Sequence, residues 1–536
     1  MTVLLRRAND LVGLPADVTW VCLPGGDALR ALPAESEMTG VSAALEDSFD
    51  RQAEQWWTIG RALSRTESAG LAHTPACVAN ASDFGQMLAW SALVQRWASE
   101  SRTVLVVCGD PWLFRHLRSF PGVTAGRSPP LWPDAIRLWL RGRAARWRVA
   151  VRLAAAALAP RTSCRNGPAG RATILVYGHP ASTGDGYDGY FGTLMGEQPA
   201  VRRMLHTDCP PDGARKLTGD GRTASLHGYG NPLFALTLGF ARWRPTAAQR
   251  RGPHGWLVRR AAAREGGTGQ AATIRWQLHC QRRWLKRCRP AVVAWPWENH
   301  AWERDLVRAA RRLGIRTIGY QHSVIGRQML NYAPRSNPDG LDSLPDRIFC
   351  TGPATRRQLA GWSVPEDRLE VAGAYRFVDR PVPARDDRAP VFVALPFDGA
   401  TAAEMVGAAR RASRNGLRFV IKDHPMTGFA FDDSPGVTRT DLPLEKQPSV
   451  SAVVYAATTV GLEAAIGGLP TFRFRPRGRI ALDILPAGFV LPTIDGDSLA
   501  SVSHAPAAQP EIRREDVFAP IDAALWRDAF KPTDRA

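Results

Sequence analysis

The chain has 536 residues, of which 45% are hydrophobic and 22% charged, so it is neither disordered nor fibrous and is long enough for two or three domains. Its formal net charge of +19 predicts an anionic partner: nucleic acid, a lipid surface or a phosphorylated substrate. The eight cysteines form no CxxC pair, which argues against zinc sites and disulfides and predicts reduced, buried thiols in a cytosolic protein.

Residues 1–125 predict an accessory α/β region. Short β-branched runs at 19–23 and 103–108 have the pattern of buried strands, and the stretches 41–66 and 82–99 between them have helical periodicity. The N-terminus lacks the apolar segment and cleavage site of a signal peptide, and no run of about 20 apolar residues occurs. We therefore expect a cytoplasmic protein without a transmembrane segment.

Residues 126–170 predict a basic, amphipathic helical linker. Within 130–160, tryptophans and aliphatic residues alternate with arginines, and no acid occurs from Arg137 to Arg171. Such a helix can lie in a lipid headgroup layer, so we expect peripheral contact with the inner membrane through this segment. The alternative is an interdomain helix whose arginines are simply solvated.

Residues 171–340 predict a first Rossmann-like domain. A helix at 305–313 ends at Gly314 in the C′ position, and strands precede and follow it. Short strand–helix–strand links indicate a parallel, doubly wound sheet. Residues 333–345 have the composition of a turn-rich hinge. The predicted strands are 173–177, 290–295 and 315–320.

Residues 341–536 predict a second Rossmann-like domain. The predicted strands are 347–350, 369–371, 391–395, 418–421, 452–455 and 471–474, and the predicted helices are 353–361, 401–414 and 460–467. The expected fold class is therefore α/β, with two Rossmann-like domains that face a cleft and an additional N-terminal α/β region. Ligands bind beyond the carboxyl ends of the strands in such sheets.

The segment Ile421–Pro425 places polar groups at the end of a buried strand. Lys422 and His424 are delivered to the carboxyl end, and Pro425 stops the strand. His424 can donate to a phosphate and Lys422 can add positive charge. A hydrogen-bonded turn histidine is the alternative interpretation.

The segment Tyr455–Thr471 predicts a strand, a helix start and a further strand. Thr458 and Thr459 stand at the helix N-terminus, where hydroxyls and backbone N–H groups bind phosphate. Gly461 and Glu463 follow in the first turn, and Glu463 is placed to hold a ribose hydroxyl. Ordinary helix capping is the alternative.

Together these two segments resemble the nucleotide-binding half of GT-B glycosyltransferases. The pair is similar to the His-Pro and Ser/Thr motifs of bacterial transferases that use CMP-activated keto sugars, such as the Kdo and polysialic acid capsule enzymes. Those enzymes have Lys-Pro-His-Pro and Ser-Ser, where this chain has Asp423 and Thr458-Thr459. The resemblance implies that His424 binds the donor phosphate and that the two threonines contact its oxygens.

Two further segments of the first domain resemble surface-carbohydrate biosynthesis proteins related to those transferases. They are Trp295–Glu303 and Gly319–Ser323, and each follows a predicted strand. We interpret their polar residues as groups that orient the acceptor or donor. These residues are Asn299, His300, Gln321, His322 and Ser323.

Sugar transfer also needs a base for the acceptor hydroxyl. Glu298 is the leading candidate, since it follows a strand and has tryptophans around it that should raise its pKa. Asp188, in a glycine-rich loop, is the rival. Helix capping or an ion pair for Glu298, and a turn role for Asp188, are the alternatives.

The sequence thus predicts a nucleotide-sugar-dependent glycosyltransferase that moves a keto-acid sugar from a CMP donor onto a surface-polysaccharide or glycolipid acceptor. No Asp-x-Asp motif ends a strand in the cleft, so neither a metal nor another cofactor is expected. A UDP- or CDP-linked transferase, an epimerase of the same fold and a non-catalytic basic binding protein are the alternatives. No nucleic-acid-binding signature accompanies the basic charge, so nucleic acid is not an expected partner.

Overall fold

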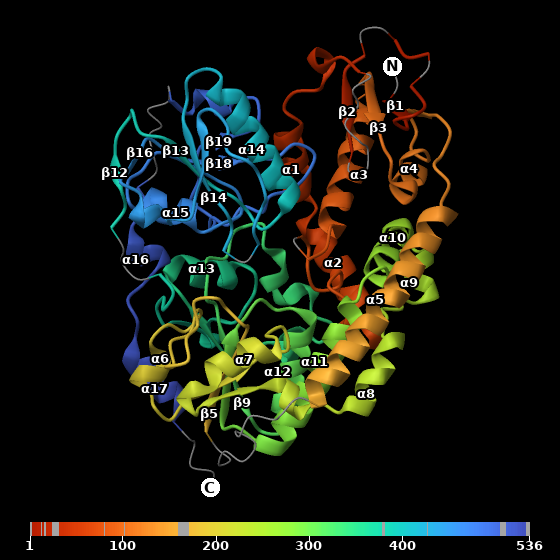
Figure 1. Cartoon of the computed structure of the whole chain (residues 1–536). Helices are drawn as coiled ribbons and strands as arrows, with labels where there is room; N and C mark the ends of the chain where they lie inside the picture. The colour runs from red at the N-terminus through yellow and green to blue at the C-terminus, as the bar shows by residue number, and fades with distance from the viewer. Residues whose placement is uncertain are drawn as a thin grey trace.

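Continuous apolar runs form the centre of each sheet, because a parallel strand is buried on both faces. Val104–Val107, Val292–Pro296 and Val391–Ala394 are buried at every position. The computed structural model describes residues 3–531 apart from 12, 16–17, 24–31, 80, 101, 159–170, 378–380, 426 and 504–510. Figure 1 shows three bodies: the accessory region, a first Rossmann-like domain below it, and a second beside it. The predicted fold class is confirmed.

The accessory region contains a parallel four-stranded sheet in the order β2-β3-β1-β4. The long basic helix α5 follows it. The elements are β1 (Val3–Arg6), β2 (Trp20–Cys22), α1 (Val41–Arg51), α2 (Ala53–Ser64), η2 (Glu67–Leu71), α3 (Phe84–Ser99), β3 (Val104–Val107), α4 (Pro111–Leu117), β4 (Val123–Ala125) and α5 (Trp132–Leu158).

The first Rossmann-like domain contains a parallel seven-stranded sheet in the order β11-β10-β9-β8-β5-β6-β7. Its strands are β5 (Ala172–Val176), β6 (Arg202–Leu205), β7 (Thr223–Ser225), β8 (Val292–Pro296), β9 (Arg316–Tyr320), β10 (Arg347–Cys350) and β11 (Leu369–Val371). Its helices are α6 (Leu194–Glu197), α7 (Pro211–Leu217), α8 (Pro232–Leu236), η6 (Thr237–Phe240), α9 (Ala247–Arg251), α10 (Gly255–Gly266), α11 (Gln270–Cys288), α12 (Ala301–Arg311) and α13 (Pro353–Gly361).

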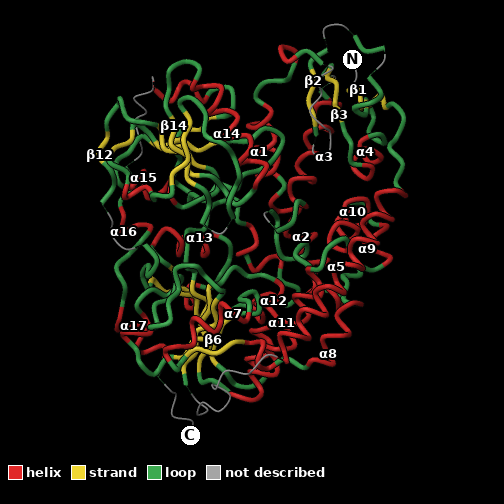
Figure 2. Tube along the Cα trace, viewed as in Figure 1, coloured by secondary structure: helices red, strands yellow, loops and turns green. Residues whose placement is uncertain are grey.

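The second Rossmann-like domain contains a parallel six-stranded sheet in the order β15-β14-β13-β17-β18-β19. Figure 2 shows this sheet and the seven-stranded sheet as two separate groups of strands. Its elements are β13 (Val391–Ala394), α14 (Gly399–Ser413), β14 (Phe419–Lys422), β15 (Val437–Thr440), β17 (Val453–Tyr455), α15 (Val460–Ile466), β18 (Thr471–Phe474) and β19 (Thr493–Ile494), with β12 (Ala384–Arg385) and β16 (Ser449–Val450) as a separate pair.

The predicted boundary between 171–340 and 341–536 is wrong. β10 pairs with β9, with Ile348 opposite Gly319, and β11 pairs with β10, so both strands complete the first sheet. The sequence located both strands at their observed residues. It does not record which sheet a strand joins, because that choice depends on pairing between segments far apart in the chain.

The hinge predicted at 333–345 is also wrong. This segment is a connection inside the first domain that is anchored by fully buried residues, among them Ser336 and Asn337. The Arg304 guanidinium donates to the Ser336 hydroxyl at 2.9 Å, and the Asn299 amide donates to Asn337 Oδ1 at 3.0 Å. Prolines and glycines made these tight turns look like a flexible linker in the sequence.

The chain passes between the two Rossmann-like domains twice. It leaves the first domain after β11 and returns through α16 (Arg514–Val517) to α17 (Ala523–Phe530). Trp526 of α17 is fully buried against the first sheet, with its ring 4.7 Å from that of Phe349. Residues 341–536 therefore do not form one contiguous domain.

A single carboxylate joins the three bodies. Glu46 of α1 is 8% exposed and accepts from Arg327 of the first domain at 3.0 Å. It also accepts a hydrogen bond from Arg473 of β18 and pairs with Arg475 at 2.6 Å. Since a buried charge is stable only when it is paired, this cluster fixes the accessory region against both other domains.

Seven of the cysteines lie in the described residues; all are free thiols, and Cys164 falls outside that part of the chain. Among the same residues, no helix has the length and hydropathy needed to cross a bilayer.

Replacement of Glu46 by alanine should lower the free energy of unfolding by about 3 kcal/mol, because the buried Arg473 would lose its nearest carboxylate and keep only Asp483, at 3.9 Å. Urea denaturation measures the change. Glu54→Ala, which breaks an exposed pair with Arg335, should cost under about 1 kcal/mol. Equal losses in the two variants would contradict the linking role of Glu46.

Candidate functional site

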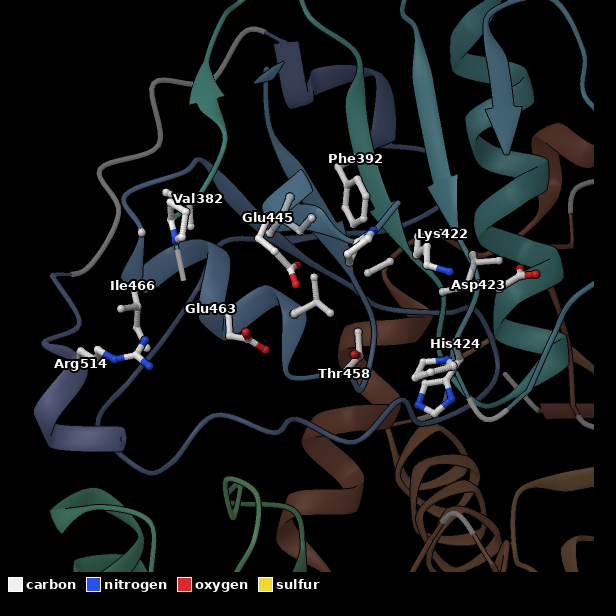
Figure 3. A pocket seen from close by; sticks show the side chains of 18 residues that line it. Val382, Phe392, Lys422, Asp423, His424, Glu445, Thr458, Glu463, Ile466 and Arg514 are labelled. Atoms are coloured by element: carbon white, nitrogen blue, oxygen red, sulfur yellow. The ribbon is translucent and has the colours of Figure 1, made fainter. Parts of the chain in front are cut away.

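A cavity of about 320 Å³ lies at the carboxyl ends of the strands in the second domain. β14 supplies Lys422 and leads into His424, while the turn after β17 supplies Thr458. Figure 3 shows Lys422, Asp423 and His424 at one end, and Val382, Ile466 and Arg514 at the other, with Glu445 and Glu463 between them. The cavity is therefore elongated, with Lys422 and His424 at one end and two aliphatic side chains beside Arg514 at the other.

His424 is held at the first end of this cavity. Its ring lies edge-on to Phe397, with centroids 5.8 Å apart. Burial, with a smaller contribution from Arg376, lowers the pKa of His424 below its ordinary value of 6.5. The imidazole is therefore mainly neutral at pH 7, and it can donate one hydrogen bond without bringing a full charge. Pro425 follows directly and also lines the cavity.

Thr458 and Thr459 have different positions relative to the cavity. Thr458 lines the cavity, whereas Thr459 is the residue that precedes α15, and its side chain makes no capping hydrogen bond. Ala457, immediately before them, has a φ of +47°, a backbone conformation that costs energy in residues other than glycine and is concentrated at functional turns. Thr458 is thus the better-placed phosphate ligand.

Gly461 is not among the residues that line the cavity. A Cβ atom at this position would lie 2.1 Å from the Tyr455 ring, so Gly461 allows α15 to pack closely on β17. Glu463, two residues later, does line the cavity. The sequence could not separate the two because both lie in the first turn of one helix.

Glu298 stands in the first domain, directly after β8, between two histidines. Its carboxylate lies 2.7 Å from His300 Nε2 and 3.9 Å from His322 Nε2. Burial would raise its pKa, but the hydrogen bond and charge of His300, with His322 and Arg376, outweigh burial and lower the pKa to about 2. The prediction of a raised pKa is therefore wrong, and Glu298 stays ionised as an ion-pair partner.

The two histidines respond in opposite directions. Burial would lower the pKa of His300, but the hydrogen bond and charge of Glu298 outweigh it and raise that pKa. For His322, burial prevails, helped by Arg376 and His179, and lowers the pKa to about 4. His322 is therefore neutral at pH 7, whereas His300 is protonated more readily.

Asn299 and Gln321 support the loops of the site. Asn299 is fully buried with a φ of +56°, and its amide donates to the carbonyl of Asn331 at 2.8 Å. Gln321 is fully buried and accepts from the Thr351 hydroxyl at 3.1 Å. Ser323 is partly buried beside His322. An acceptor-orienting role for Asn299 is wrong, because its side chain is committed to the protein interior.

Asp188 is not a cleft base. It is fully buried, and its carboxylate accepts from the backbone N–H of Tyr190 at 2.9 Å and of Phe191 at 3.2 Å. Arg203 lies 3.7 Å away and shares its buried position. Burial raises the pKa of Asp188 despite these contacts. Its role is to fix the glycine-rich loop, which the sequence made look flexible.

Sequence reasoning missed Arg376, which lies on the crossing between the domains. Its charge acts on Glu298, His322 and His424, which lowers the pKa of each. Burial lowers the pKa of His179, which follows β5, to about 4, with smaller contributions from Arg376 and His424. Arg376 therefore couples electrostatically to groups that follow strands of both sheets. The one indication in the sequence was that Arg376 comes soon after the predicted strand 369–371. That strand had been placed in the second domain, whereas it belongs to the first sheet.

Several buried nitrogen atoms in this region have no protein partner within the described part of the chain. They are His179 Nε2, His300 Nδ1, His322 Nδ1 and Gln321 Nε2. Buried polar groups are normally hydrogen-bonded, so their concentration around Glu298 indicates a place where water or a polar ligand completes the site. Within the part of the chain that the structure describes, no three or more His, Cys, Asp or Glu side chains are grouped so that they could hold a metal ion.

A second cavity of about 660 Å³ lies between the accessory sheet, α5 and α10. Its buried charges are already paired: Asp110 accepts from Arg260 at 2.7 Å, and Glu265 accepts from the backbone of His73 and Thr74. Asp110, Arg260 and Glu265 therefore all have hydrogen-bond partners within the protein, and they stabilise the fold around this cavity.

Comparison of the sequence with protein-family models and with curated proteins gives no match. Among solved structures, the chain is similar to the glycotransferase of kitacinnamycin, at 14% identity over 68% of this chain and 100% of that one, with a TM-score of 0.40. It is also similar to the calicheamicin glycosyltransferase CalG4, at 12% identity over 65% of this chain and 93% of that one, with a TM-score of 0.39. A third similar structure is UDP-N-acetylglucosamine 2-epimerase from Rickettsia bellii, at 11% identity over 58% of this chain and 80% of that one, with a TM-score of 0.31. At these scores the fold assignment rests on the sheet topology itself.

Proposed function

We propose that the protein is a nucleotide-sugar-dependent glycosyltransferase. The observation on which this depends is the pairing of an elongated cavity in one Rossmann-like domain with the Glu298–His322 pair in the other. The electrostatic influence of Arg376 on both His322 and His424 supports the view that the two halves act on one substrate.

The graded lining of the cavity matches the parts of a nucleotide. A phosphate fits the end with Lys422, His424 and Thr458, where a cation, a neutral N–H donor and a hydroxyl converge. Glu463, in the middle, suits ribose hydroxyls. The apolar side chains at the far end, Val382 and Ile466, suit the face of a base.

The proposed reaction is a displacement at the anomeric carbon. The bond from that carbon to the donor phosphate breaks, and its electron pair goes to the phosphate oxygen, which Lys422 and His424 stabilise. The acceptor hydroxyl oxygen forms the new bond and loses its proton to His322 Nδ1. Glu298 then stabilises the imidazolium, as a carboxylate does beside a catalytic histidine. In this proposal neither a metal nor another cofactor is required.

Arg376 supports a keto-acid sugar as the donor. Such a sugar has a carboxylate on its anomeric carbon, next to the bond that breaks. The Arg376 guanidinium lies over the ring of Tyr190, 6.0 Å from its centroid, and that ring lies 5.0 Å from the ring of His322, so Arg376 supplies a cation near the base with which such a carboxylate could pair. A CMP-linked donor is proposed because the transferases that the sequence motifs resemble use keto-acid sugars in this form. The acceptor is proposed to be a surface polysaccharide or a glycolipid.

His424→Ala should weaken CMP binding by about ten- to hundredfold, because a hydrogen bond to a charged phosphate is lost. Thermal stabilisation by CMP, UDP and their sugars measures this, with His254→Ala, outside the cavity, as the matched control. Stabilisation by UDP but not CMP would overturn the donor assignment. Conversion of a nucleotide sugar to its epimer without an acceptor would identify an epimerase.

His322→Gln should lower kcat by about 10²–10⁴-fold while leaving CMP affinity unchanged. Because the pKa of His322 is about 4, kcat/KM of the wild type should stay nearly level from pH 7 to about pH 5. His116→Gln is the matched control, since burial also lowers the pKa of His116 to about 4 in the accessory region. A kcat near the wild-type value in His322→Gln would exclude it as the base.

Arg376→Gln should reduce kcat/KM for a CMP-linked keto-acid sugar by about tenfold or more, since an ion pair to the sugar carboxylate is lost. Affinity for CMP itself, which lacks that carboxylate, should not change. Arg312→Gln, an exposed arginine of the first domain, is the control. An equal loss of CMP affinity would assign Arg376 to the phosphate instead.

A further inference from the structure

Exposed large hydrophobic side chains are concentrated on one face of the molecule. Of the fifteen in the described residues, ten lie on α5, α8 and η6, which we call the α5–α8 face. Scattered apolar residues are normal on a protein surface, but a contiguous group marks an interaction site. The ten are Trp132, Ile136, Trp139, Leu140, Trp147, Val151, Leu158, Leu233, Leu236 and Phe240.

α5 presents three different stripes along its length. One stripe is buried and includes Leu138, Leu153 and Ala157. The exposed apolar residues recur every three or four positions and form the second stripe. Exposed arginines, among them Arg148 and Arg152, lie on the third, beside the apolar stripe. This arrangement of apolar and basic stripes side by side is typical of helices at a lipid interface.

α8 and η6 extend the apolar stripe beyond α5. They pack directly beside it, as Figure 1 shows for α5 and α8. The ring of Phe240 meets that of Trp147 edge-on, with centroids 5.6 Å apart. Leu233 and Phe240 are 75% and 64% exposed. The sequence did not indicate this part of the surface, because it lies about 90 residues from α5 along the chain.

The α5–α8 face is fixed to the body of the protein. Arg146 is buried and donates to the carbonyl of Gly266, at the end of α10, at 2.6 Å. Gly142 approaches the same carbonyl so closely that an added Cβ atom would lie 1.8 Å from it. α5 is therefore not a detachable amphipathic helix, and anything bound to its outer face also fixes the orientation of the domains.

The charge of this face selects its partner. Asp134 is the sole acid in residues 132–158 and 231–251, which contain ten arginines. A second copy of the chain, docked face to face, would place arginines opposite arginines. An anionic bilayer satisfies both requirements, since it attracts the arginines and accepts exposed tryptophans at headgroup level.

We propose that the α5–α8 face binds the surface of an anionic lipid bilayer as one rigid, composite unit. α5 supplies both the apolar and the basic stripe, and α8 and η6 supply a second row of apolar side chains. The proposal extends the segment 130–160 expected from the sequence to residues that the fold brings beside it. It does not depend on sugar transfer.

Flotation with vesicles tests the proposal, using phosphatidylcholine alone and phosphatidylcholine mixed with phosphatidylglycerol. The full chain should float with the mixed vesicles only, and added salt should weaken its binding. Leu233→Ser combined with Phe240→Ser should lower affinity by at least about tenfold, since both side chains would enter the lipid. Arg148→Gln combined with Arg152→Gln should have a similar effect.

Matched controls separate this surface from general effects. Leu442→Ser combined with Val490→Ser removes two side chains, 48% and 76% exposed, that lie in the second domain, and should bind vesicles like the wild type. Arg357→Gln in α13 should do the same. His424→Ala should also float normally, which distinguishes lipid binding from the proposed reaction.

Three results would overturn the proposal. One is a wild-type chain that does not float with the mixed vesicles. Another is unchanged binding after the Leu233 and Phe240 substitutions. The third is a wild-type dimer, seen by light scattering, that these substitutions dissociate in a chain without affinity for lipid.

Discussion

The arrangement of the three bodies depends on the buried carboxylate of Glu46. It accepts from Arg327 of the first domain and from Arg473 of the second, while its own helix belongs to the accessory region. Arg473 is buried, and a buried arginine is costly to leave unpaired, so the second domain relies on this carboxylate of the accessory region. The accessory region thereby supplies a charge that pairs with both Rossmann-like domains.

Glu298 and its two neighbouring histidines differ strongly in pKa although all three are in the same surroundings. Glu298, His300 and His322 lie within a few ångströms of each other, yet the pKa of Glu298 is lowered to about 2, that of His300 is raised and that of His322 is lowered to about 4. The contact between Glu298 and His300 decides the pKa shifts of those two residues, and burial decides the pKa shift of His322. A site of this kind holds a neutral base beside a permanent carboxylate at pH 7, which suits proton removal from a hydroxyl.

The long basic helix α5 serves two environments at once. Its inner side is core, where Gly142 and Arg146 approach α10 closely, and its outer side is exposed and apolar with flanking arginines. The helical period of 3.6 residues keeps these roles on separate stripes. Because the inner side is fixed, the outer side has one orientation relative to the cleft. A bilayer bound there would face the same side of the protein in every molecule.

The sequence by itself determined the local structure and its chemistry. Buried runs predicted strands such as 347–350 at their observed residues, and the positions of His424 and Thr458 at strand ends predicted that they would meet at one edge of a sheet. Only the tertiary structure decided which sheet each strand joins, that Asp188 is buried, and that the charge of Arg376 acts on His322. The physical reason is that periodicity and turn chemistry are local, whereas pairing partners, burial and pKa depend on residues brought together from distant parts of the chain.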